Sequence, residues 1–383
     1  MEFILFLQRA KKVNGIICKM RILLVNNTLN SFSGTELYTL DLAKSLIALG
    51  HKPIAYSTDL GHVAEKLRAE GIPVTNDLRS LGAKPDVIHG HHHLDTLTAL
   101  LHFTDVPAIY FCHGWLPWQE APLSFPRIYK YVAVCDLSAE RLIVEGGIAP
   151  EHIHLLLNFV DLERFKQRKC LSDKPKKALA FSSFMNKERV HLIETACRQC
   201  GIKKLDKIGL HIGKTHLKPE DILGEYDIIF AKGRAALEAL ATGAAVISCD
   251  GAGSMVTTEN LERQRMANFG LSERHYPYNI DTITNEIRKY NHYDAEKVSN
   301  LIRLKTAKEA AVNNIVNLYN EVIETHINTK TDNVKLELQA VSNYLRWLRI
   351  DMDKGIPSGL TLKQKLMWIG KKILKNAKGL IVK

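Results

Sequence analysis

Residues 226–253 contain a strand, a glycine turn, a helix and a second strand in direct succession, which constrains the fold more than any other stretch. YDIIFA is a continuous apolar run typical of a buried strand, and AAVISCD is a second one. Between them, Lys232-Gly233-Arg234 predicts a tight turn, and AALEALATG predicts a short helix that ends at Gly243. Strands and helices joined by such short turns build a parallel α/β sheet.

The turn before this helix is the first candidate binding site. In parallel α/β sheets, ligands bind at the carboxyl ends of strands, where helix N-termini point. Gly233 would let a phosphate approach backbone N–H groups, and Lys232 and Arg234 add positive charge. Glu238, the only acid in the helix, is placed to accept from a ribose diol. The alternative is an ordinary strand–helix–strand unit with a solvated Glu238, and these residues alone leave both open.

The same alternation of strands and helices continues through most of the chain. It predicts an α/β fold with two Rossmann-like, doubly wound parallel-sheet domains at residues 20–165 and 175–325. The polar stretch 161–177 is the expected linker, and it contains Pro175. A chain of 383 residues is long enough for two such domains. The cleft expected between them is a favoured place for a ligand.

Residues 1–19 precede the first predicted strand, MRILLVNN, which starts at Met20. They are expected to be a flexible leader or an upstream start-site artefact. Their apolar patch comes before their basic residues, which is the reverse of a secretory signal. No apolar run reaches the roughly 18–20 residues of a membrane-spanning helix.

The tail at residues 330–383 holds most of the positive charge. It has twelve Lys and Arg against four Asp and Glu, a net charge of +8 out of +11 for the whole chain. Helices are expected at 334–350 and 360–383. The second would be amphipathic, with Trp368 near the boundary of its apolar stripe and no acid on its polar face. The stripe consists of Leu362, Leu366, Ile369, Ile373, Ala377 and Leu380.

Such a basic amphipathic helix suits an anionic membrane surface. The alternative is a helix docked on the body with a solvated lysine face. Nucleic acid is not an expected partner, because the lysines cluster in one helix without interleaved aromatic residues.

Histidine and cysteine clusters do not predict a metal site. His89, His91, His92 and His93 are nearly consecutive, and neighbouring residues of a strand alternate between faces, so they do not all reach one ion. One or two of them are expected to line the cleft. Cys197-x-x-Cys200 lacks a second pair of ligands nearby, which favours thiols on a helix surface.

Four segments together resemble the GT-B-fold glycosyltransferases, and family 4 in particular. These are SGTELYTLDLAKSLIALGH (33–51), the histidine-ended strands DVIHGHH and IYFCHG, the segment YVAVCDLSAERL with LLNFVDLERF, and AKGRAALEALATGAAVI. Their order and spacing span about residues 20–320. The resemblance implies a retaining enzyme without a bound metal or other cofactor, which takes a UDP- or GDP-linked sugar as donor.

The resemblance also implies roles for single residues. His113 is the predicted catalytic residue, in contact with the transferred sugar. Gly34 is expected to let backbone approach the donor phosphates or the acceptor, unless it is a plain loop glycine. Lys187 is expected to grip the diphosphate, unless it is a solvated surface lysine. The predicted donor-binding residues are Gly34, Lys187, Lys232, Gly233, Arg234 and Glu238.

Two positions depart from the family pattern. The first of its two donor-motif glutamates falls on Phe230, and Ser183 stands near its expected arginine. Lys232 and Arg234 are expected to compensate. On the acceptor side, Trp115, Trp118 and Glu120 form a loop suited to sugar or lipid, with Glu120 a candidate acid or base.

The expected function is sugar transfer to a lipid-linked or cell-envelope glycan, on the cytoplasmic, inner face of the cell membrane. Two alternatives stay open. One is a non-catalytic nucleotide-sugar-binding scaffold of an envelope-glycan assembly complex, which Phe230 and Ser183 favour. The other is a sugar-nucleotide epimerase of the same fold, which has no need of a membrane helix.

Overall fold

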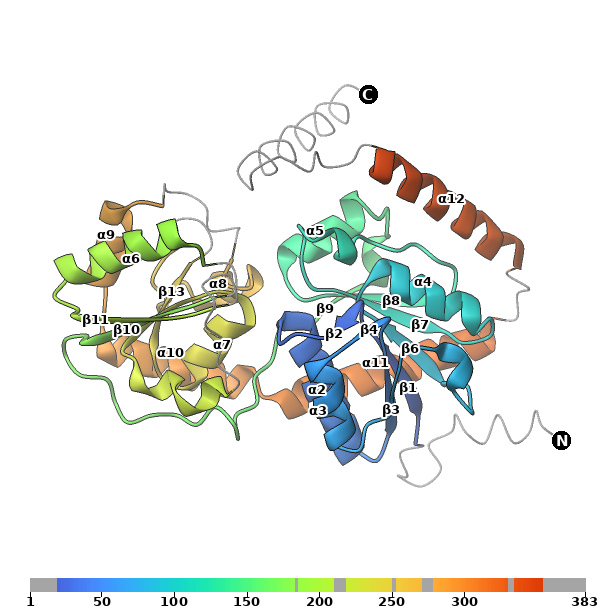
Figure 1. Ribbon diagram of the computed structural model, residues 1–383, viewed down its shortest axis with the longest axis horizontal. Coiled ribbons are helices and arrows are strands. Elements are labelled where there is room, and N and C mark those ends of the chain that lie inside the picture. The colour runs from blue at the N-terminus through green and yellow to red at the C-terminus, as the bar shows by residue number, and fades with distance from the viewer. Residues whose placement is uncertain are drawn as a thin grey trace. The chain divides into compact units, whose positions relative to one another are not determined.

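The computed structural model describes residues 19–182, 185–209, 218–249, 253–270, 278–329 and 334–353 (Figure 1). Nearly all of the expected leader, Ser183 and the basic helix expected at 360–383 lie outside these ranges. The chain divides into two compact units, residues 1–330 and residues 331–383. The first unit contains both large sheets.

The first sheet is seven-stranded and parallel, in the order β5-β3-β1-β6-β7-β8-β9. The order reverses between β1 and β6, which makes this the switch point at which doubly wound sheets bind ligands. The strands are β1 (Arg21–Val25), β3 (Lys52–Tyr56), β5 (Val74–Thr75), β6 (Val87–Gly90), β7 (Ala108–Cys112), β8 (Ile128–Ala133) and β9 (Ile153–Leu155). The helices that connect them are α2 (Gly34–Ala48), α3 (His62–Ala69), α4 (His93–His102) and α5 (Asp136–Val144).

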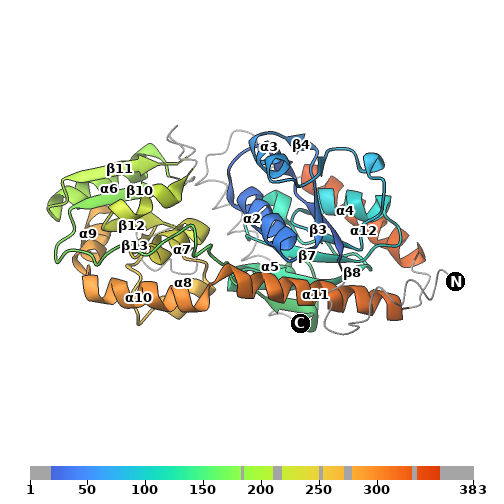
Figure 2. The same cartoon turned by 90° about the horizontal axis from the view of Figure 1, so that it is seen from below.

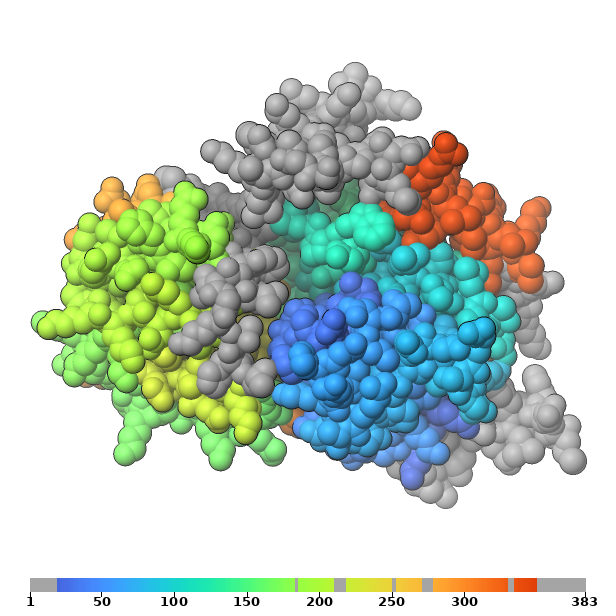
Figure 3. All heavy atoms as spheres, viewed as in Figure 1, coloured from blue at the N-terminus to red at the C-terminus, as the bar shows by residue number. Residues whose placement is uncertain are grey.

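The second sheet is four-stranded and parallel, in the order β11-β10-β12-β13, with its switch point between β10 and β12. Its strands are β10 (Lys177–Phe181), β11 (Lys204–Ile208), β12 (Ile228–Ala231) and β13 (Ala245–Ser248). Its helices are α6 (Lys187–Gln199), α7 (Gly233–Ala241), α8 (Leu261–Met266), α9 (Ile280–Arg288) and α10 (His292–Lys305). Most of each half comes from one stretch of the sequence, seen as a blue-to-cyan and a green-to-orange block in Figure 3. The predicted fold class is confirmed.

Helix α11 (Lys308–Asn328) departs from the predicted domain boundary at residue 325. It follows α10 along the chain, yet it packs on the first sheet, beside β7 and β8 (Figure 2). Ile315, Tyr319 and Val322 are fully buried in the core of the first half. The sequence order placed this helix with the second sheet, whereas burial of its apolar side places it with the first.

The hydrophobic clusters show where the side chain of Phe230 is buried. Phe230 on β12 is buried in a cluster with α6 and α9, which includes Ile193 and Ile283. Most of the buried side chains of α7 belong to a separate cluster, which does not include Phe230. On α2, the buried stripe includes Tyr38, Leu42 and Leu46, while Ile47 is 40% exposed.

The second unit begins with α12 (Val334–Asp353), which matches the helix expected at 334–350. Among the described residues, no helix is both long and apolar enough to cross a membrane.

Candidate functional site

The predicted residues of the first half gather at the carboxyl ends of β1 and β6. Immediately after β1, the Asn27 N–H donates to Nδ1 of His92, which follows β6, over 3.2 Å. The Asn26 amide donates to the Thr39 hydroxyl of α2 over 3.1 Å, which ties the strand end to the helix. Hydrogen bonds therefore link the end of β1 both to α2 and to the residue that follows the end of β6, at the switch point of this sheet.

Helix α2 begins at Gly34 without a side-chain cap from Ser33. A Cβ atom added to Gly34 would meet nothing within 4 Å, so the backbone here faces open space. Glu36, in the same first turn, is buried and accepts from the Thr35 hydroxyl at 3.1 Å and from the hydroxyl of Ser33. Glu36 was not among the predicted site residues, although the Gly-Thr-Glu stretch contained it.

His113 follows β7 and packs against Tyr38 of α2, with ring centroids 4.9 Å apart. Its Nε2 is 2.8 Å from Nδ1 of His91. Burial lowers the pKa of His113 to about 3, so its imidazole is neutral at physiological pH. The predicted catalytic residue thus lies at the carboxyl edge of the first sheet as an uncharged group.

The four neighbouring histidines have four different partners. His89 contacts Tyr319 of α11, His91 contacts His113, and His92 accepts from Asn27. The ring of His93 meets Trp118 edge-on at 4.6 Å. Within the described ranges, no group of three or more His, Cys, Asp or Glu is placed to hold a metal ion.

The expected acceptor loop folds partly inward. Trp118 is 38% exposed, but Trp115 is half-buried, and its Nε1 is buried without a hydrogen-bond partner. Glu120 is buried and accepts from the N–H of Gly114. Burial raises the pKa of Glu120 to about 7, and Arg141 offsets only part of this. Of the three residues, Trp118 is the most accessible to an acceptor.

In the second half, Gly233 opens α7 at the end of β12. Its φ of +56° is a conformation that glycine adopts without strain. Its own N–H donates to the carbonyl of Asn268 at 3.0 Å, so the expected free N–H at Gly233 is not observed. By helix geometry the next two N–H groups, of Arg234 and Ala235, have no acceptor earlier in the helix, an arrangement that favours an anion.

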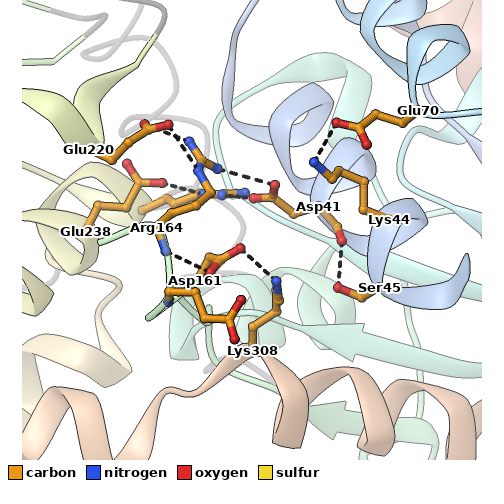
Figure 4. Close-up of polar contacts among 11 residues, drawn as sticks. Asp41, Lys44, Ser45, Glu70, Asp161, Arg164, Glu220, Glu238 and Lys308 are labelled. Atoms are coloured by element: carbon orange, nitrogen blue, oxygen red, sulfur yellow. Dashed lines mark hydrogen bonds and ion pairs between the residues drawn. The ribbon is translucent and has the colours of Figure 1, made fainter. Parts of the chain in front are cut away.

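Arg234 belongs to a network of ion pairs that joins the two halves of the first unit. Figure 4 shows Asp41, Arg164, Glu220 and Glu238 of this network. Arg234 pairs with Asp41 of α2 through Nη2, and its Nε donates to Glu238 at 2.8 Å. Arg164 of the linker also reaches Asp41 at 3.4 Å and Glu220 at 2.9 Å. Burial opposes the charge on Arg234, but the two carboxylates outweigh it and raise its pKa.

This network changes two of the predicted roles. Glu238 is buried and bonded to Arg234, not open to a ribose as expected. Arg234 keeps one nitrogen, Nη1, that is buried and has no hydrogen-bond partner. The arrangement therefore leaves a fixed, charged donor at the N-terminus of α7, with Glu238 and Asp41 fixing its orientation.

Two further cations, Lys232 and Lys187, were predicted to bind the donor. Lys232 is the N-cap residue of α7, directly before Gly233. Lys187 is exposed at the start of α6. Its neighbour Arg189 instead reaches the carbonyl of Cys249, beyond β13, at 3.2 Å, so Arg189 lies nearer the carboxyl edge of the second sheet.

The chain is similar to known glycosyltransferases in both sequence and fold. Residues 32–164 match the model of Glycosyltransferase Family 4. No curated protein matches the chain. The Family 4 match covers the Gly34 loop, the histidine-ended strands and nearly all of the segment that ends at Phe165, which are three of the four segments that carry the resemblance. It ends before the fourth, AKGRAALEALATGAAVI.

Solved structures extend the likeness to both halves. A glycosyltransferase from Rickettsia africae has a TM-score of 0.57 at 15% identity, covering 80% of this chain and 99% of its own. Anabaena HepE in complex with UDP has a TM-score of 0.58 at 15% identity, covering 78% and 99%. AviGT4, a glycosyltransferase of avilamycin A biosynthesis, has 0.51 at 12%, covering 80% and 98%. The chain therefore has the GT-B fold.

Proposed function

We propose that this protein is a glycosyltransferase that transfers a sugar from a nucleotide-diphosphate sugar to a hydroxyl of an acceptor glycan. The observation that carries the proposal is Arg234, whose unpartnered Nη1 lies at the N-terminus of α7, at the carboxyl edge of the second sheet. Structures of the similarly folded HepE contain UDP and UDP-glucose, which favours a uridine nucleotide as the donor.

In this reaction the acceptor oxygen forms a bond to the anomeric carbon of the sugar, and the bond from that carbon to the diphosphate oxygen breaks. The nucleoside diphosphate leaves with an additional negative charge, and the proton of the acceptor hydroxyl passes to solvent. Arg234 and the N–H groups at the start of α7 would stabilise this charge without a metal ion. Neutral His113 would position the transferred sugar, and retention of configuration follows the Family 4 resemblance.

The acceptor and the location belong to the same proposal. Trp118 offers an exposed aromatic face to a sugar or a lipid. The lysine-rich sequence 360–383 would hold the enzyme on an anionic membrane surface. We therefore propose a lipid-linked or cell-envelope glycan as the acceptor, modified on the cytoplasmic face of the cell membrane.

A panel of UDP- and GDP-sugars tests this proposal, with donor hydrolysis and transfer as readouts. We expect turnover with at least one donor, and a fall of about 10-fold or more in the Glu238→Ala variant, because that change releases Arg234. Glu262→Ala, which removes an exposed carboxylate paired with Lys305, is the matched control. No binding of any nucleotide sugar to the folded protein, together with unchanged behaviour of Glu238→Ala, would refute the proposal.

A second candidate is a non-catalytic subunit that binds nucleotide sugars. Phe230 at the position of the first motif glutamate favours it, as does the engagement of both Arg234 and Glu238 in ion pairs. Calorimetric binding of a nucleotide sugar with no transfer to any acceptor and no hydrolysis would select this alternative.

A further inference from the structure

Two histidines at the carboxyl edge of the first sheet share a single hydrogen bond. His91 Nδ1 and His113 Nε2 are 2.8 Å apart, so one of these nitrogens donates and the other accepts. His91 is fully buried, whereas His113 is partly exposed. Burial lowers the pKa of both imidazoles far below the ordinary value, so each ring carries one N–H.

Because the two rings share one hydrogen bond, the tautomer of His91 and the tautomer of His113 depend on each other. If His91 donates from Nδ1, then His113 accepts at Nε2 and must carry its own hydrogen on Nδ1. If His113 donates from Nε2, its Nδ1 is a bare acceptor. Nδ1 of His113 has no hydrogen bond to any residue in the described part of the chain. It is therefore the nitrogen left for a ligand, and its protonation is coupled to that of His91.

The surroundings hold His91 in place. Its ring meets Tyr38 edge-on at 5.6 Å and lies 4.6 Å from the ring of His89. His89 is itself stacked on Phe111 at 4.1 Å and bonded through Nδ1 to the Tyr319 hydroxyl at 2.6 Å. A ring packed on several sides does not turn to offer its other nitrogen, Nε2, which is buried without a partner.

We propose that His91 is a positioning residue, whose hydrogen bond to Nε2 of His113 fixes whether Nδ1 of His113 donates to or accepts from a hydroxyl of the transferred sugar. This inference deepens the proposed function and rests on it for the identity of the ligand. A positioning role of this kind parallels the way in which metal- and triad-bound histidines are oriented by a second partner.

Nitrogen NMR on the full-length protein, labelled with ¹⁵N-histidine, tests the inference without any sugar. Long-range ¹⁵N–¹H correlations report which ring nitrogen is protonated, and the His113→Asn variant identifies the His113 signals. We expect one tautomer of His113 in the wild type, and a scalar coupling across the hydrogen bond between His91 Nδ1 and His113 Nε2. A mixture of tautomers or no coupling would overturn the inference, and this measurement needs no variant at position 91.

Three variants separate positioning from packing. His91→Leu removes the hydrogen bond and should give both tautomers of His113. His91→Asn places an amide near the same point and should restore a single one. Tyr319→Phe deletes a different hydrogen bond of the same buried group and should leave His113 unchanged. An unaltered His113 spectrum in His91→Leu would overturn the inference.

The transfer assay provides the functional readout. We expect His91→Leu to lower kcat about 3- to 10-fold, as loss of one hydrogen bond predicts, with KM for the nucleotide sugar within about 3-fold. His91→Asn should recover most of the loss. If no donor is turned over, the proposed function fails while the tautomer result stands. If transfer occurs but His91→Leu matches the wild type in kcat, the inference fails while the proposed function stands.

Discussion

The carboxyl group of Glu120 is buried against the backbone of Gly114, where a Cβ atom would come within 2.9 Å of Oε2. That oxygen has no hydrogen-bond partner among the described residues. Burial without full compensation favours the neutral acid, which is why its pKa rises to about 7 from an ordinary value of 4.5. Glu120 should therefore couple the stability of the first half to pH.

Replacement of Glu120 by Gln should remove this coupling. In the folded wild type Glu120 binds its proton more tightly than in the unfolded chain. Its contribution is therefore fully present below pH about 4.5 and is lost as the pH rises through about 7. Above pH 7, Glu120→Gln should be more stable than the wild type by up to about 3 kcal/mol. Below pH 4.5 the two should unfold alike.

Urea unfolding between pH 4 and pH 8 measures this difference. Glu145→Gln is the control, because Glu145 is 48% exposed and pairs with Arg141, the cation whose charge also lowers the pKa of Glu120. Parallel curves for the wild type and Glu120→Gln over the whole range would contradict the assigned pKa.

Single residues also mark the limit of prediction from sequence. The position of Gly233 at the start of a helix was correct, because the strand, glycine and alanine-rich run are local signals. The use of its N–H by Asn268 could not be predicted, since Asn268 lies on a separate loop and adopts a φ of +50°, uncommon for a residue other than glycine. Glu36 was missed because a glutamate in a first helical turn usually serves only the helix dipole.

Helix α2 packs on the first sheet and α7 packs on the second. An ion pair between Asp41 of α2 and Arg234 of α7 links the two helices. The carboxylate of Asp41 accepts from Arg234 and from Arg164, and it is 8% exposed (Figure 4). Removal of one partner from a buried pair leaves the other charge without compensation. In Asp41→Ala, Arg234 keeps only Glu238, so we expect a loss of stability of roughly 2–3 kcal/mol.

Denaturant unfolding of Asp41→Ala and Lys44→Ala measures this contribution. Lys44 lies on the same helix and pairs with Glu70, but both side chains are nearly half exposed. That surface pair should contribute less than about 1 kcal/mol. Equal effects of the two substitutions would show that the network around Asp41 does not hold α2 to α7.

At the level of elements, the contact between Arg234 and Glu238 could be predicted from the sequence, whereas the contact between Arg234 and Asp41 could not. Arg234 and Glu238 are four residues apart on a helix, a spacing at which side chains meet. Asp41 lies 193 residues before Arg234, on a helix whose sequence has the pattern of an ordinary amphipathic helix. No local pattern shows which of its faces meets the second half.

For the whole molecule, the alternation of strands and helices predicted both sheets, because each strand–helix pair is encoded by its own periodicity. Helix α11 is the exception. Its apolar side has the same pattern whichever sheet it covers, and only the tertiary structure shows that Tyr319 reaches His89 of the first half. The boundary of the second half was therefore the part that the sequence order could not define.

At the scale of the whole molecule, the testable prediction concerns the lysine-rich residues 360–383. If residues 360–383 bind an anionic surface, Lys371→Glu, Lys372→Glu and Lys375→Glu together should weaken binding to phosphatidylglycerol vesicles by about 100-fold or more, at about 1 kcal/mol for each lysine. Binding should also weaken as salt is raised. Vesicle sedimentation measures this.

A charge-matched control distinguishes the tail from the overall charge. Lys166, Lys169 and Lys174 are exposed in the linker, and their joint replacement by Glu changes the net charge equally. Equal losses of vesicle binding in the two triple variants would contradict a role specific to the tail.

The central claim is that a nucleoside diphosphate is held at the start of α7 by Arg234, and one calorimetric comparison tests it most directly. The affinities of the mono- and diphosphates of uridine and guanosine are measured for the wild type, for Arg234→Lys and for Lys305→Ala, which loses an exposed pair with Glu262. We predict that one diphosphate binds the wild type about 10-fold or more tighter than its monophosphate. Arg234→Lys, which lacks the planar fork, should lose most of this preference, and Lys305→Ala should retain it. Equal binding of mono- and diphosphate by the wild type, or an undiminished preference in Arg234→Lys, would contradict the account.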